Sequence, residues 1–98
     1  MVYQEVFPVL QDWKSRQCLV QIEKHPHVYD GIITDVSEDS GKLELSTAQP
    51  GEGQKTLVFE FAGAYFQRWP TELGEGWDEG FMVFPQAGGL LKLRKCKT

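Results

Sequence analysis

The stretch from Gln17 to Ser46 constrains the fold of this chain more than any other part of it. Apolar and polar residues alternate over three short segments, Gln17–Glu23, His27–Val36 and Lys42–Ser46. Such alternation predicts strands that each bury one face. A Lys-His-Pro turn joins the first two segments, and an acidic Ser-Glu-Asp-Ser-Gly bend joins the last two. We therefore expect a compact antiparallel meander.

Gly31 lies inside the second predicted strand, between Tyr29 and Ile33. A glycine inside a strand often marks a sharp bend or the close approach of another backbone. A short sheet needs such bends in order to curl onto itself. Gly31 therefore predicts that the meander is strongly bent, as in a small antiparallel β-barrel.

A short amphipathic helix is expected before the strands. Residues 1–7 are predicted to form an extended arm, and Pro8 suits the first turn of a helix because its missing N–H would be unpaired there. Val9, Leu10 and Trp13 would then share one face. We expect this helix to cap one end of the barrel, with Trp13 as its plug.

The second half of the chain continues the β pattern. A fourth strand is expected at Thr56–Phe61, a further strand or turn around Tyr65–Trp69, a polar loop from Pro70 to Gly80, and a final hairpin from Phe81–Phe84 and Leu90–Cys96. A length of 98 residues predicts a single domain over residues 1–98. The segment from about residue 70 is interpreted as a C-terminal extension of that domain.

With these elements, the chain resembles the Sm-like superfamily over about residues 5–66. Members of that family have an N-terminal helix followed by a strongly bent five-stranded barrel, and they assemble into rings. Gly31 and Ile33 match the start of the first family motif. Phe61-Ala62-Gly63 matches the glycine of the second motif but lacks its arginine. An SH3-like barrel is the alternative, so the predicted fold class is mainly β: a small, strongly bent Sm-like or SH3-like barrel with a short N-terminal helix.

The resemblance also implies an RNA site. Asp39 and Gly41 lie near the family's turn Asp and Asn, with shifted spacing, and Gly63 holds the position of the motif glycine. In the family, the turn Asn and the motif Arg bind a base and its phosphate. Gly41 and Ala62 stand in their places here, so we expect RNA binding at Asp39, Gly41 and Gly63 to be weak or replaced by a role as an assembly scaffold.

The net charge of the chain argues against nonspecific binding to nucleic acid. The chain has ten basic and fourteen acidic residues and a net charge of −4, whereas nonspecific phosphate binding depends on Lys and Arg. The one basic cluster in the sequence lies at the C-terminus and consists of Lys92, Arg94, Lys95 and Lys97. This segregation suits docking onto a basic protein or head-to-tail assembly, and simple solubility is the alternative interpretation.

Aromatic residues mark a candidate partner site. Tyr65, Arg68, Trp69 and Trp77 lie close in sequence around a glycine-rich acidic loop. Trp and Tyr are common anchors of protein interfaces, and they also stack on nucleic-acid bases. A third alternative is that Trp69 and Trp77 fold back over the core.

The sequence offers no catalytic residue, metal site or cofactor motif. Cys18 with His25 or His27 is the nearest nucleophile pair, but Cys18 is predicted to point inward, where a thiol is inert. His25 and His27 lack a third ligand. Cys18 and Cys96 are expected to be reduced core residues, with a disulfide as the alternative, and this favours a cytosolic location. No apolar run predicts a membrane segment.

Two function hypotheses follow. The first is a non-enzymatic binding module, a divergent Sm-like homo-oligomer that binds RNA weakly or serves as a scaffold. The alternative is an acidic adaptor or inhibitor, of the immunity or phage type, that docks onto a basic partner.

Overall fold

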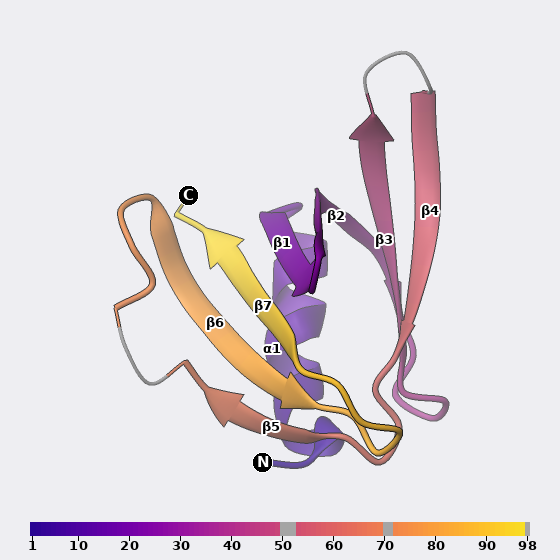
Figure 1. The fold of residues 1–98 in the computed structure, drawn as a ribbon. Coiled ribbons are helices and arrows are strands. Elements are labelled where there is room, and N and C mark those ends of the chain that lie inside the picture. Colours follow the sequence, from indigo (N-terminus) through magenta and orange to yellow (C-terminus); the bar gives the residue numbers. More distant parts are fainter. Residues whose placement is uncertain (50–52, 70–71, 98) are drawn as a thin grey trace.

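The computed structural model describes residues 1–49, 53–69 and 72–97. They form one helix and seven strands (Figure 1): α1 (Tyr3–Ser15), β1 (Leu19–Lys24), β2 (His27–Val36), β3 (Lys42–Gln49), β4 (Gly53–Glu60), β5 (Tyr65–Arg68), β6 (Trp77–Phe84) and β7 (Leu91–Cys96). The mainly β fold with an N-terminal helix is therefore confirmed. The second strand has its predicted bounds, whereas β3 and β4 form a longer hairpin than the alternation indicated.

All seven strands belong to one antiparallel sheet, in the order β4-β3-β2-β1-β7-β6-β5. The last strand of the chain lies in the middle of this sheet, where β7 pairs with β1. The segment from about residue 70, interpreted from sequence as an extension, thus supplies β6 and β7 to the same sheet as the meander.

The sheet has to curl, because its two end strands are joined by a short link. Only residues 61–64 connect β4 to β5, and this link spans at most about 18 Å. In a flat sheet, six strand spacings would separate the two edges by about 29 Å. Figure 1 shows the two edges meeting near this link and then diverging, with α1 behind. Since β4 and β5 do not pair with each other, the described strands form an open sheet, and barrel closure is not confirmed.

Gly31 allows the backbone of β3 to approach β2 closely, as predicted for a glycine inside a strand. A Cβ atom at this position would overlap the backbone carbonyl oxygen of Ser46 in β3. The β2–β3 register also shifts between Ile33 and Asp35. β2 can therefore pair with β1 over its first half and with β3 over its second half, which turns the β3–β4 hairpin away from the rest of the sheet.

The core lies between α1 and the face of the sheet that packs against it, called here the inner face. Four residues of α1 at helical spacing are buried: Tyr3, Val6, Leu10 and Trp13. Trp13 is fully buried, and its ring centroid lies 6.0 Å from that of Phe81 in β6. The expected inward position of Trp13 is confirmed, whereas the barrel end that it was expected to plug is not, since the described strands form an open sheet.

The predicted start of the helix is wrong, because residues 3–7 are helical rather than an extended arm. Glu5 stabilises the first turn by accepting a hydrogen bond from the Val2 backbone N–H, at 3.1 Å. Pro8 lies inside the helix and leaves the Gln4 carbonyl without its amide donor. Because Gln4 is exposed, water can hydrate that carbonyl.

The predicted loop from Pro70 to Gly80 is wrong at its end, since β6 already begins at Trp77. Pro70 and Thr71 lie outside the described residues. The acidic pair after Trp77 is typical of a loop, but the β6–β7 register shifts between Trp77 and Glu79. Such a bulge re-aims side chains at a strand end, and here both carboxylates find partners inside the fold.

Candidate functional site

The three residues predicted to contact RNA come together in space. Asp39, Gly41 and Gly63 line one hollow of about 230 Å³. Its other lining residues come from the start of α1, the β2–β3 turn and the β4–β5 link: Val2, Tyr3, Gln4, Glu38, Ala62 and Ala64.

Gly41 has a structural role in this hollow. Its φ is +68°, and a Cβ there would lie 2.8 Å from the backbone nitrogen of Ala62. Its carbonyl oxygen accepts a hydrogen bond from the Phe61 N–H, at 2.7 Å. Gly41 therefore holds the β2–β3 turn against the link between the two edge strands, which explains a glycine here without any ligand.

The hollow is acidic. Glu38 and Asp39 line it, and its lining among the described residues contains no Lys or Arg. The Tyr3 hydroxyl donates to the Ser37 carbonyl at 2.8 Å. Burial, and then the carboxylates of Asp35 and Glu38, raises the pKa of Tyr3 to about 12. This electrostatic environment suits a cationic partner better than a phosphate.

The four predicted partner residues do not form one surface. Tyr65 lies on the outer face of β5, 56% exposed, and its ring centroid is 6.4 Å from that of Phe84. Arg68 instead stacks over buried Phe81 on the inner face, at 5.3 Å. Trp69 and Trp77 lie elsewhere, against Arg94. The structure thus divides the predicted cluster into three locations.

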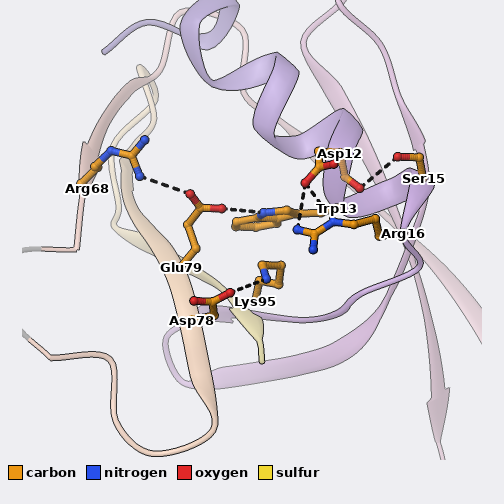
Figure 2. Close-up of polar contacts among 8 residues, drawn as sticks. All are labelled: Asp12, Trp13, Ser15, Arg16, Arg68, Asp78, Glu79 and Lys95. Carbon is orange, nitrogen blue, oxygen red and sulfur yellow. Dashed lines mark hydrogen bonds and ion pairs between the residues drawn. The ribbon is translucent and has the colours of Figure 1, made fainter. Parts of the chain in front are cut away.

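Arg68 belongs to a chain of internal polar contacts, drawn in Figure 2. Its guanidinium lies 3.4 Å from Glu79 Oε2, while Glu79 Oε1 accepts a hydrogen bond from the Trp13 indole N–H at 2.9 Å. The acceptor for the buried indole therefore comes from the bulge in β6. The indole hydrogen bond fastens α1 to the sheet, and Arg68, whose side chain is 62% exposed, pairs with the same carboxylate.

A buried lysine, Lys95, lies beside the contacts made by Arg68, Glu79 and Trp13. The Lys95 side chain is only 1% exposed, and its Nζ lies 2.8 Å from Asp78 Oδ2 (Figure 2). The hydrogen bond from Lys95, and then its charge, lowers the pKa of Asp78. Because the ammonium has a carboxylate partner, its burial is accounted for as part of the fold.

Trp69 and Trp77 pack around Arg94 on the outer face. The Arg94 Cζ lies 4.0 Å from the ring centroid of Trp77 and 5.6 Å from that of Trp69. Arg94 also donates to Gln21 Oε1 at 2.9 Å and to the Leu73 carbonyl at 2.8 Å. Sequence reasoning missed this cluster, since it depends on the pairing of β7 with β6. Both rings are half-buried, so much of their surface is used inside the fold.

A larger cleft, of about 800 Å³, was also missed. It is lined by residues 23–25 at the end of β1 and the turn after it, 58–61 at the end of β4, and 85 and 87–92, which run from the β6–β7 connection into β7. Apolar Phe59 and Leu91 line it together with charged Glu23, Lys24 and Lys92. Leu90, which follows two glycines in the sequence and is 39% exposed, also lines it.

The free edge of β4 borders this cleft. Among the described residues β4 pairs with β3 alone, so the N–H and C=O groups on its other side have no strand partner. Val58, on the outer face of β4, is 53% exposed. At the opposite edge, by contrast, Val2 bridges to Tyr65 and the Phe66 N–H donates to the Met1 carbonyl at 2.7 Å.

Comparisons with known proteins give no relative: no protein-family model, curated protein or solved structure matches this chain. Within the described residues, no three His, Cys, Asp or Glu side chains are grouped closely enough to hold a metal ion. In the same part of the chain, no helix has both the length and the apolar character needed to cross a bilayer.

Proposed function

We propose that this protein is a non-enzymatic binding module that joins other polypeptide strands to the free edge of its sheet. One observation carries the proposal: β4 is eight residues long, no other described strand pairs with its free edge, and it borders a cleft of about 800 Å³. An uncovered edge is a template for another strand, and main-chain pairing with side-chain pockets beside it is a common mode of peptide recognition.

Copies of this chain are the partners we favour. The helix followed by a curled sheet supports an Sm-like or SH3-like half-barrel, and proteins of the first kind assemble through their sheet edges. We therefore infer a homo-oligomeric assembly scaffold. RNA contributes little to this proposal, because the hollow that contains Asp39, Gly41 and Gly63 is acidic.

Light scattering after gel filtration tests the proposal, with nuclease-treated and untreated samples. We expect a mass above that of one chain, unchanged by nuclease. Val58→Lys, which places a charge at the edge, should return the protein to a single chain. Leu19→Lys is the matched control, because Leu19 is 46% exposed on central strand β1 and should leave the mass unchanged. A single-chain mass at every concentration would contradict the proposal.

The acidic hollow supports a second function, docking onto a basic protein. Glu38 and Asp39 provide the negative charge there. A lysine-rich peptide is the probe: we expect salt-sensitive binding that is lost in the double variant E38Q/D39N. The double variant E72Q/E75Q removes the same charge from another part of the surface and should bind normally. Equal losses in both variants would show only a net-charge effect.

A further inference from the structure

The two edges of the sheet are not equivalent, and the difference selects a partner. β5 has only four residues, and Met1 and Val2 already pair with Tyr65 and Phe66 on its outer side. β4 has eight residues, and no segment within 1–49, 53–69 and 72–97 pairs with its free edge. A head-to-tail joint between β4 and β5 would have to displace Met1 and Val2, whereas a joint between two β4 strands breaks no strand pairing of the described residues.

We propose that the strand that occupies the β4 edge is β4 of a second copy, antiparallel and related by a two-fold axis. The inference rests on the proposed function and specifies its partner. A two-fold joint uses the same surface on both copies and therefore closes as a dimer, whereas a head-to-tail joint gives a ring or an open fibre. The product is one antiparallel sheet that is continuous across two copies.

The geometry of antiparallel pairing restricts the register. Directly opposed residues lie on the same face of a sheet, so outer residues of β4 must oppose outer residues of its copy. Val58 is the exposed apolar residue of the outer row, which also contains Thr56 and Glu60. A pairing centred on Val58 places it opposite its own copy and places Thr56 opposite Glu60. Two β-branched side chains then cover each other, and no like charges are directly opposed.

This register also completes the cleft. The cleft is lined by residues 58–61 of β4, and the partner's strand would run beside that same segment. The second copy therefore adds a wall to each cleft, close to Phe59. Val58→Lys should disrupt the joint because it would bring two ammonium groups together at the dyad.

Cysteine cross-linking tests the register. The background is Cys96→Ser, since Cys96 is half-buried, whereas Cys18 is 2% exposed and remains. Under mild oxidation, V58C should form a disulfide-linked dimer at least tenfold more completely than I32C. Ile32 is the control because it is 41% exposed on strand β2, away from the edge. An equimolar mixture of T56C and E60C should cross-link, and either variant alone should not. Circular dichroism checks that each variant is folded.

The outcomes separate the two proposals. A two-chain mass with the V58C cross-link supports the two-fold joint. An oligomer in which V58C links only to a cysteine placed at Gln67 of β5 would overturn the two-fold joint and leave the proposed function standing. A single-chain mass for the folded protein, with no cross-link in any variant, would overturn both.

Discussion

The half of the sheet made by β5, β6, β7 and β1 differs from the hairpin of β3 and β4. In the first half, large buried side chains such as Phe66, Phe81 and Leu93 pack beneath α1, and Met1 and Val2 cover part of the edge. In β4, residues 53–56 are exposed and Phe59 is its one buried side chain. Strand β3 of the hairpin still contributes Leu43 and Leu45 to the core. The comparison teaches that the two regions share one core and differ at their edges, because β5 is partly covered whereas β4 leaves backbone groups available for a partner.

The largest expected effect tests the first half. Trp13→Ala removes a fully buried ring and leaves the Glu79 carboxylate without its indole donor. We expect the free energy of unfolding to fall by about 3–5 kcal/mol, measured by urea titration. Trp69→Ala on the outer face is the control, since that ring is half-buried, and it should cost clearly less. Equal losses would contradict the assignment of the core.

The second prediction concerns the bend between the two regions. In Gly31→Ala, the new methyl group would overlap the Ser46 carbonyl oxygen, so β3 must move away from β2. We expect a loss of about 1–3 kcal/mol. Amide hydrogen exchange should accelerate mainly in β3 and β4 and change little in β6 and β7. An equal acceleration of exchange in β3–β4 and in β6–β7 would mean that the two regions open as one unit.

The third prediction concerns the buried charge of the first half. Asp78→Asn leaves the Lys95 ammonium buried without a counter-ion, so the melting temperature at pH 7 should fall. Lys95→Met removes the charge at similar volume and should change the melting temperature little. The double variant should recover most of the melting temperature that Asp78→Asn loses. If Asp78→Asn and the double variant have the same melting temperature, loss of the ion pair does not explain the destabilisation.

The pH dependence of this ion pair has a definite sign. Because Lys95 lowers the pKa of Asp78, the pair contributes its full stability above the ordinary carboxyl range. That contribution is lost as the pH falls below about 4. The melting temperature of Asp78→Asn should therefore decline less on acidification than that of the unmodified protein.

The smallest expected effect concerns Tyr3, which connects α1 to the β2–β3 turn. Tyr3→Phe removes the hydrogen bond to Ser37 and should cost about 1 kcal/mol at pH 7. Because the pKa of Tyr3 is raised to about 12, its contribution is complete below pH 10 and is lost as the pH rises toward 12. Alkaline unfolding followed by circular dichroism should be less steep in Tyr3→Phe, and identical curves would contradict this role.

Local patterns predicted local structure well. Alternation located β2 to the residue, and Gly31 predicted the bend because a strand glycine signals a close backbone approach. The helix begins before the point that Pro8 indicates, because Glu5 stabilises an earlier first turn and Tyr3, Val6 and Leu10 already have helical spacing.

Long-range pairing could not be read from the sequence. The residues around Arg94 do not indicate that β7 lies between β1 and β6. The stacking of Arg94 on Trp77 and the cleft at the end of β4 therefore could not be predicted. The strand order also determines which edge stays open. The acidic hollow was partly predictable, since Asp39 and Gly41 share one turn.

Amide hydrogen exchange of β4 as a function of protein concentration tests the central claim most directly. We predict that the β4 amides that do not pair with β3 exchange rapidly in dilute solution and become protected as concentration rises, while protection in β6 and β7 stays constant. Protection of β4 that is the same at every concentration would contradict the claim that this edge binds a second copy.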